Sequence, residues 1–458
     1  MKINNLWQAF HRVLERLRTA KTMYRRIKLF LILAFVALAI FQTGQLWFVN
    51  ISNRNFFLFL SNQRRGSVAD GHHEFVRPMR WIYGDGTGRF NISYSGLMDT
   101  PSRAFFDTVL TDLFSSGTFV SVGETDYAKL LSNPILMFEY AFPMPANIFP
   151  VAFNPRSSTV LTGQGVDAFT SIAIWLPDDG NESGLRVFFI NDDAAWEFTV
   201  DSVAAEGFPV TAVSTIALHF VSAALEEEYE ELPPNVFIPR TGDFGQFSYY
   251  PVVVTNPYFS YGQGLAHVRG KVAPFFDNPA TINSRVAGDG VWTFSNIHAT
   301  VRYFGTGVLE YANFRPRRQG TSSSFISDFS AALSFINNDE YVINEIFLMG
   351  YEPHGAGYVF RFGYIINYFP ILMPDGWPVS SPDDILLAPI EVYVEEGWVV
   401  FYRRLTHNFS LDTQNLWLQN NRLNLDAILQ GREEPITGLS LGYNMRSMGN
   451  LILGLQGW

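Results

Sequence analysis

The chain has 458 residues, of which 47 % are hydrophobic and 16 % aromatic, and this composition excludes a disordered or low-complexity protein. Its formal net charge is −11, which argues against a nucleic-acid-binding surface. It contains no cysteine, so disulfide bonds and zinc sites built from thiolates are excluded.

The first predicted element is a long apolar stretch near the N-terminus. Sixteen of the twenty residues 29–48 are apolar and none is charged. Twenty helical residues span about 30 Å, the thickness of the hydrocarbon core of a bilayer. Residues 1–28 carry eight basic residues and one acid, so the positive-inside rule places them in the cytoplasm. We therefore expect residues 29–49 to form a single transmembrane helix in the cell membrane, with the bulk of the chain extracytoplasmic.

Two kinds of residue in this stretch predict contact with a partner helix. Gln42 and Gln45 lie three positions apart and share a helix face at lipid depth. There an amide favours a hydrogen-bonding partner by about 0.6–2 kcal/mol, and small residues at heptad-like spacing allow close approach of a second helix. The predicted contact residues are Ala34, Ala37, Phe41, Gln42, Gly44 and Gln45. The alternative is that the two glutamines lie near the outer headgroups and bind water.

Two alternatives concern the ends of this helix. Residues 1–28 repeat apolar residues at helical spacing between arginines, which fits an amphipathic helix on the inner leaflet as well as an ordinary basic flank. Ala37-Leu38-Ala39 fits the cleavage pattern of a signal peptide. Cleavage there would leave an apolar new N-terminus, so we expect an uncleaved anchor.

The charge balance changes once residues 1–28 are set aside. The 32 basic and 43 acidic residues then become 24 and 42, a net charge of −18 for the remainder. Such a surface does not suit nucleic acid. An exported region of this size without cysteine is typical of a Gram-positive bacterium, whose outer domains depend on packing alone.

The part after the anchor is predicted to be a strand-rich, multi-domain α+β region. Residues 50–76 are polar and are expected to form a stalk, and residues 77–148 an N-terminal α+β domain. Its elements are predicted as strands 79–83 and 89–94 around the turn 84–88, a helix that begins at Thr100-Pro101 and ends at Gly117, a helix 126–131 and a strand 135–141.

Residues 149–255 are predicted to form a central sheet domain. Its elements are strands 168–176, 185–190 and 196–200, a helix 213–230 that ends before Pro233-Pro234, and a strand 246–254. Residues 256–458 are predicted to form a C-terminal α+β domain. Its elements are strands 291–295, 299–303 and 308–314, a helix 322–336, strands 343–348, 358–365 and 390–394, a strand 398–403 after a tight turn, a helix 425–430, and strands 439–443 and 451–455.

No motif predicts a catalytic residue, a metal site or a cofactor. Residues 438–442 match G-x-S-x-G, but no acid or histidine follows, as a serine hydrolase requires, and Ser440 alternates with leucines as in a strand. His72-His73-Glu74 has no third ligand at a recognised spacing. Paired aspartates such as Asp383-Asp384 fall in predicted turns, where backbone geometry favours Asp. A glycosidase stays open, because its two acids are distant in the chain.

The ordered set of motifs in the last region resembles the YycH family, membrane-anchored regulators of the WalK sensor kinase in the WalK/WalR (YycG/YycF) system of Firmicutes. The segments that carry the resemblance are Pro274-Phe275-Phe276-Asp277-Asn278-Pro279, Val291-Trp292-Thr293-Phe294, residues 301–311 (VRYFGTGVLEY), Ala331-Ala332-Leu333-Ser334-Phe335-Ile336, Tyr358-Val359-Phe360-Arg361-Phe362 and Ile390-Glu391-Val392-Tyr393-Val394. The sequence departs from the family in its long basic N-terminal extension and its glycine-rich end.

This resemblance implies a non-enzymatic regulator of cell-wall metabolism. It implies a WalK-type sensor histidine kinase and a YycI-like protein as partners, contact through the transmembrane helices, and a last domain with a YycI-like or PepSY-like fold. Two rival functions stay open. A membrane-anchored cell-wall hydrolase would need two opposed acids in a cleft, and an outer ligand-binding or assembly protein without a kinase partner would tolerate any membrane anchor.

Overall fold

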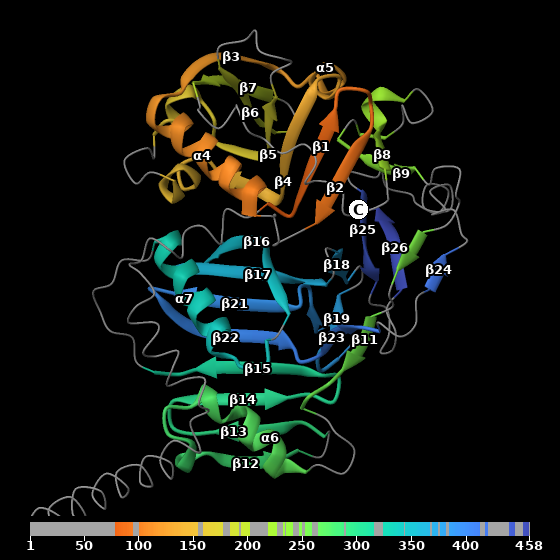
Figure 1. Cartoon of the computed structure of the whole chain (residues 1–458). Helices are drawn as coiled ribbons and strands as arrows, with labels where there is room; N and C mark the ends of the chain where they lie inside the picture. Colours follow the sequence, from red (N-terminus) through yellow and green to blue (C-terminus); the bar gives the residue numbers. More distant parts are fainter. Residues whose placement is uncertain are drawn as a thin grey trace, which may run out of the picture. The chain divides into compact units, whose positions relative to one another are not determined.

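The computed structural model describes twenty segments of the chain, all after residue 77 (Figure 1). They are residues 78–94, 100–153, 159–176, 184–191, 194–201, 219–226, 232–233, 235–240, 247–249, 252–258, 264–287, 290–315, 324–342, 344–366, 369–373, 376–381, 384–412, 417–419, 439–444 and 452–457. No helix within these segments is both long and apolar enough to cross a bilayer. The predicted cytoplasmic segment, transmembrane helix 29–49 and stalk lie outside them.

Nine strands form the first sheet, and each neighbouring pair is antiparallel (Figure 1). In spatial order they are β3 (Thr118–Glu124), β7 (Ala194–Val200), β6 (Leu185–Ile190), β5 (Ala168–Trp175), β4 (Pro134–Pro145), β1 (Arg80–Asp85), β2 (Phe90–Tyr94), β8 (His219–Ser222) and β9 (Phe237–Arg240). The sheet takes strands from both sides of the predicted boundary between residues 148 and 149. Hydrogen bonding therefore joins the two predicted segments in one layer.

One face of this sheet is covered by α4 (Thr100–Ser116). Its apolar residues recur every three or four positions, so one stripe faces the sheet. Measured between ring centroids, Phe106 lies 4.1 Å from Phe138 of β4, and Phe114 lies 6.3 Å from Phe189 of β6. The helix ends at Gly117 as predicted; its N–H donates to Leu113 O at 2.8 Å, and a Cβ there would lie 2.6 Å from the same oxygen. The short helix α5 (Tyr127–Leu131) follows β3 and is capped by the Asp126 side chain.

Eleven strands form the second sheet. In spatial order they are β12 (Asn283–Val286), β13 (Trp292–Ser295), β14 (Ala299–Tyr303), β15 (Val308–Asn313), β22 (Trp398–Leu405), β21 (Ile390–Glu395), β17 (Gly357–Ile366), β18 (Phe369–Leu372), β25 (Leu439–Asn444) and β26 (Ile452–Gly457), with β16 (Glu345–His354) paired to β17. β18 and β25 run parallel, and the other described pairs are antiparallel. The predicted hairpin between β21 and β22 turns at Glu396 and Gly397, both at positive φ (52° and 76°), as its tight two-residue turn requires.

The helix α7 (Phe325–Asn338) packs against β17, β21 and β22. Its buried residues follow helical spacing, and the rings of Phe325 and Phe329 each lie 5.5 Å from that of Phe360. Ser324 caps the first turn by accepting from the Ser327 N–H at 3.2 Å. Asp328, on the buried face, accepts from the Gly397 N–H at 2.7 Å and so fixes the helix to the β21–β22 turn.

Smaller elements complete the described segments. The two-stranded sheets are β10 (Phe247–Tyr249) with β24 (Trp417–Gln419), β11 (Val252–Thr255) with β23 (Asn408–Leu411), and β19 (Trp377–Pro378) with β20 (Ile385–Leu386). The remaining helices are α6 (Leu265–Val272) and the 3-10 turns η2 (Phe149–Ala152), η3 (Thr162–Gln164), η6 (Ala223–Leu225), η8 (Ala273–Phe275) and η9 (Pro279–Thr281).

Most sequence-based elements are confirmed, and two expectations are wrong. The helix predicted for 213–230 is wrong, because residues 219–225 form β8 and η6, and β8 pairs with β2 and β9. The single strand predicted for 246–254 is two strands in different sheets, β10 and β11. The structure also contains elements that were not predicted: the strands β3, β9, β12, β18, β19, β20, β23 and β24, and the helix α6. The helix predicted for 425–430 lies outside the described residues.

Candidate functional site

An open groove lies among the described residues at the β3 edge of the first sheet. It has a volume of about 160 Å³. Its lining residues come from β3, β5, β6, β7 and from α5 with its cap: Ser121, Gly123, Glu124, Thr125, Asp126, Lys129, Leu130, Trp175, Arg186, Phe188, Ala195 and Glu197. Ser121 and Phe188 are both register partners of Glu197, and antiparallel partners share a face. The groove therefore lies on the sheet face opposite α4.

The floor of the groove is aromatic and its walls are charged. The Trp175 and Phe188 rings lie 4.8 Å apart, and Trp175 Nε1 donates to Leu130 O of α5 at 3.0 Å. The Arg186 guanidinium lies 5.5 Å from the Trp175 ring and 3.4 Å from Glu197 Oε1. Ser121 Oγ donates to Glu197 Oε2 at 3.2 Å. The groove thus combines an apolar base with carboxylates that water reaches.

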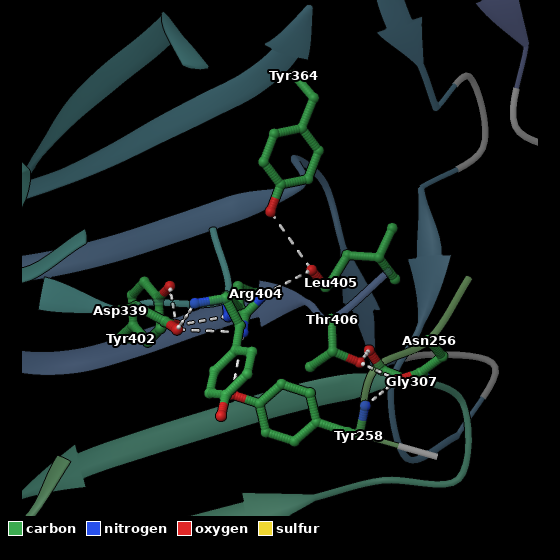
Figure 2. Close-up of polar contacts among 10 residues, drawn as sticks. Asn256, Tyr258, Gly307, Asp339, Tyr364, Tyr402, Arg404, Leu405 and Thr406 are labelled. Atoms are coloured by element: carbon green, nitrogen blue, oxygen red, sulfur yellow. Dashed lines mark hydrogen bonds and ion pairs between the residues drawn. The ribbon is translucent and has the colours of Figure 1, made fainter. Parts of the chain in front are cut away.

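A second polar feature is a buried cluster around Arg404 of β22 (Figure 2). The Arg404 side chain is fully buried, and its Nε lies 2.6 Å from Asp339 Oδ2, which is 1 % exposed. Arg404 Nη2 donates to Asp339 Oδ1 at 3.2 Å and to the Tyr258 hydroxyl at 3.0 Å. The Tyr402 hydroxyl donates to Asp339 Oδ2 at 3.1 Å. Asp339 is the C-cap of α7, so the cluster joins that helix end to β22.

The cluster continues through Thr406 into two loops (Figure 2). Thr406 Oγ1 lies 2.7 Å from Gly307 O and 3.3 Å from Asn256 Oδ1. Asn256 Nδ2 donates to the Tyr303 hydroxyl at 2.9 Å. Side chains therefore tie segments 256–258, 303–307, 339 and 402–406 together, and all of them except the half-buried Asn256 are buried.

Burial controls the titration of these groups. Desolvation raises the pKa of Tyr364 to about 12, partly offset by Arg404, and raises the pKa values of Tyr258 and Tyr402 further. Burial by itself lowers the pKa of Arg404, but Asp339 and the tyrosines raise it well above its usual value. Arg404 therefore stays charged and the phenols stay neutral at physiological pH.

His407, next to this cluster, is 2 % exposed, and neither ring nitrogen has a hydrogen-bond partner within the described segments. Burial, followed by the nearby charge of Arg404, lowers its pKa to about 4. Its ring meets Trp377 edge-on at 5.6 Å. Gly307 leaves space for the His407 ring, because a Cβ on residue 307 would lie 2.3 Å from His407 Cε1. Gly307 also has a positive φ of +84°, which favours glycine. The imidazole is a neutral packing group in this position.

The two features have different chemical capacities. Arg404 and Asp339 are buried, so the Arg404 cluster offers no charged group to a ligand. The groove beside β3 is open and presents carboxylates, a guanidinium and an indole together. The groove beside β3 is therefore the candidate site at which a ligand or a partner protein can bind.

The predicted contact residues Ala34, Ala37, Phe41, Gln42, Gly44 and Gln45 lie outside the described segments, as does His72-His73-Glu74. Ser440 lies on β25, as the alternation with leucines indicated. Asp384 accepts from Ser380 Oγ at 2.6 Å and lies 3.0 Å from Arg403 Nη2. Within the described ranges, no three His, Asp or Glu side chains come together as a metal site.

Sequence reasoning missed both polar features, although signals for them exist. Arg403 lies at the end of the predicted strand 398–403 and Arg404 follows it, so alternation along a slightly longer strand turns one of them inward, and a buried arginine requires a carboxylate. Residues 118–124 contain two valines and a phenylalanine after a helix-ending glycine, a composition that favours a strand.

Comparison with known proteins yields one solved structure. No family model matches the chain, and no curated protein matches it. The crystal structure of YycH from Bacillus subtilis is similar to this chain at 10 % identity with a TM-score of 0.49, covering 86 % of this chain and 97 % of that one.

Proposed function

We propose that the chain is a membrane-anchored extracytoplasmic regulator of a WalK-type sensor histidine kinase, and that it acts with a YycI-like partner on cell-wall metabolism. One observation carries the proposal. The six segments that resemble the YycH family are not scattered in the fold. Five of them form β13, β14 with β15, α7, β17 and β21, and the sixth spans η8 and η9. If the six segments resembled the family only by chance, we would not expect them to lie in neighbouring strands of one sheet and in the helix that covers it.

The sequence supports the membrane part of the proposal. The basic residues before the apolar stretch 29–48 orient it with the N-terminus in the cytoplasm, and the acidic remainder lies outside. In this position the anchor packs beside the kinase helices, and the outer region shifts the population of kinase conformations by binding a partner. The last region, 256–458, is proposed to share the YycI-like fold.

The test is a membrane pull-down of the full chain beside a chain whose residues 29–48 are replaced by an unrelated apolar helix. We expect the native chain alone to recover a histidine kinase and a YycI-like protein. Recovery by both chains would assign the contact to the outer region instead. Recovery by neither would refute the regulator function, and an assay of wall hydrolysis would then decide the enzymatic alternative.

A sharper version uses single positions. Changing Gln42 and Gln45 to Leu keeps the stretch apolar and removes both amides, so kinase recovery is expected to fall several-fold. Thr43→Leu is the matched control, because Thr43 lies about 200° around a helix from Phe41, opposite the predicted contact face. An equal loss in both variants would show that the face does not matter.

A further inference from the structure

The strand β3 ends the nine-stranded sheet with an edge that no other described strand covers. Its seven residues pair on one side with β7 alone. Six of them are exposed, and Val120 and Val122 keep 49 % and 56 % of their surface in water. An edge strand leaves a row of N–H and C=O groups free for another strand.

Edges of soluble sheets are commonly protected by charge, proline or shortness. The edge strand β12 of the second sheet has such protection, since it has only four residues and one of them is the charged Arg285. β3 has no lysine, arginine or proline and one acid, Glu124. A register shift lies between Phe119 and Ser121, and the four residues after it pair regularly with β7. The stretch Ser121 to Glu124 is therefore a regularly paired edge without lysine, arginine or proline.

The groove described above opens directly beside this edge. Ser121 and Gly123 belong to both, and their register partners on β7, Glu197 and Ala195, line the groove too. We propose that β3 binds an extended segment of a partner protein as an added antiparallel strand, and that basic side chains of this segment enter the groove. The proposal concerns the outer region alone and does not depend on the proposed kinase partner.

Charge selects a basic segment. The groove holds three carboxylates, of Glu124, Asp126 and Glu197, against two cations. Glu124 has no ion-pair partner within the described segments, and Asp126 accepts a backbone N–H from the α5 turn at 3.0 Å. The net charge of −18 after residue 28 disfavours pairing with a second copy of the same acidic chain. A lysine or arginine entering the groove would meet carboxylates and the apolar Trp175–Phe188 floor, which suits a basic head on an aliphatic stem.

Register defines the probe. On an added strand, residues opposite Ser121 and Gly123 face the groove, and the residue opposite Val122 faces the α4 side. The peptide acetyl-Gly-Thr-Lys-Val-Lys-Thr-Gly-amide places two lysines and a valine at these positions. The same peptide with glutamates for lysines tests charge. A peptide with prolines for its threonines and valine keeps the charge but loses three N–H donors.

The experiment measures peptide affinity and amide hydrogen exchange on the full chain in nanodiscs of zwitterionic lipid. We expect saturable binding of the basic peptide below about 1 mM. We also expect slower exchange in 118–124 with no change in 283–286, and no binding of the other two peptides. Gly123→Leu fills the groove mouth, since a Cβ at Gly123 meets nothing within 4 Å, and it is expected to abolish binding. Gly163→Leu, at another exposed glycine with open space, is the matched control.

Glu124→Gln with Glu197→Gln is expected to weaken binding about five-fold, because each partly exposed ion pair contributes a factor of about 1.5 to 5. Thermal unfolding of each variant verifies that it is folded. Absence of saturation, equal binding of the glutamate peptide, or unchanged binding to Gly123→Leu would each refute the proposal. Concentration-dependent protection of 118–124 without peptide would assign the edge to a second copy and also overturn it.

Discussion

Replacing Asp339 by asparagine tests whether the Arg404 cluster holds the second sheet together. The substitution keeps the shape of the side chain and removes its charge. Asp339 lies against Arg404 Nε at 2.6 Å and Nη2 at 3.2 Å, and it accepts from the Tyr402 hydroxyl at 3.1 Å. In the variant the guanidinium stays fully buried beside a neutral amide. Because a buried charge without its counterion is poorly solvated, we expect unfolding to become easier by about 3–5 kcal/mol.

The assay is equilibrium unfolding of the chain in urea, with the midpoint and slope compared between variants. Glu352→Gln is the control, because Glu352 pairs with Arg361 at 2.9 Å in a site where the two side chains are 50 % and 25 % exposed. That pair is worth about 0–1 kcal/mol. Adding Arg404→Met to the Asp339 variant removes the unpaired charge and is expected to restore part of the loss. A loss below about 1 kcal/mol for Asp339→Asn would refute the reasoning.

Two further predictions concern the neighbourhood of this cluster. The pKa of His407 is lowered to about 4 in the folded chain against about 6.5 unfolded, so the unfolded state binds more protons as the pH falls, and stability is lost from about pH 6.5 to 4. The protonation of His407 should therefore lower the free energy of unfolding by about 2 kcal/mol at pH 5 relative to pH 7. Urea titrations at the two pH values measure this difference, and His407→Phe should remove it. Gly307→Ala puts a Cβ against the His407 ring at φ +84° and should cost at least about 1–3 kcal/mol in the same titration. Gly305→Ala, in open space at ordinary φ, should cost less than about 0.5 kcal/mol.

Patterns of neighbouring residues correctly predicted those helices, strands and turns whose structure depends on their local sequence alone. The apolar, β-branched and aromatic run in 185–190 gave β6 with both ends correct, and Asp126 with Lys129 marks the start of α5 through a cap within three residues. The helical spacing of Phe, Ala and Leu residues in 322–336 predicted the helix α7, and the buried residues of α7 follow this spacing. The positive φ angles at Glu396 and Gly397 follow from a two-residue turn between alternating strands. These features need no information from distant parts of the chain.

Elements that depend on distant partners were not predictable in the same way. Residues 219–225 lie in an alanine- and leucine-rich stretch with helical propensity, yet Phe220 pairs with Phe90 and Val221 with Ile238. Sheet pairing overrides a propensity that amounts to less than about 0.7 kcal/mol per residue. β10 and β11 pair with β24 and β23, more than 150 residues away in the chain. Pro251, which has no N–H to give a ladder, was the signal that 246–254 is not one strand.

The residues of the Arg404 cluster and of the groove were also not predictable from local sequence, because they come from distant parts of the chain. Asp339 and Arg404 are 65 residues apart, and no spacing rule connects them. The groove collects residues from 121 to 197, whose common face exists only once β3, β5, β6 and β7 are in register. Residue types in the sequence can indicate that a buried arginine needs an acid. They do not identify which of the 43 acidic residues is used.

Two arginine–carboxylate pairs in this chain illustrate why solvent access separates a structural site from a recognition site. Arg404 and Asp339 are sealed, so exchanging partners would require breaking a pair in a medium where an unpaired charge costs several kcal/mol. Arg186 and Glu197 lie 3.4 Å apart with side chains 40 % and 19 % exposed, so water replaces either partner at a cost of about 0–1 kcal/mol. A cation from another chain can therefore compete for Glu197 but not for Asp339. The charge of Glu197 contributes little to the stability of the fold and is accessible to a partner. We therefore expect Glu197→Gln to weaken binding of the basic peptide and to leave the free energy of unfolding nearly unchanged.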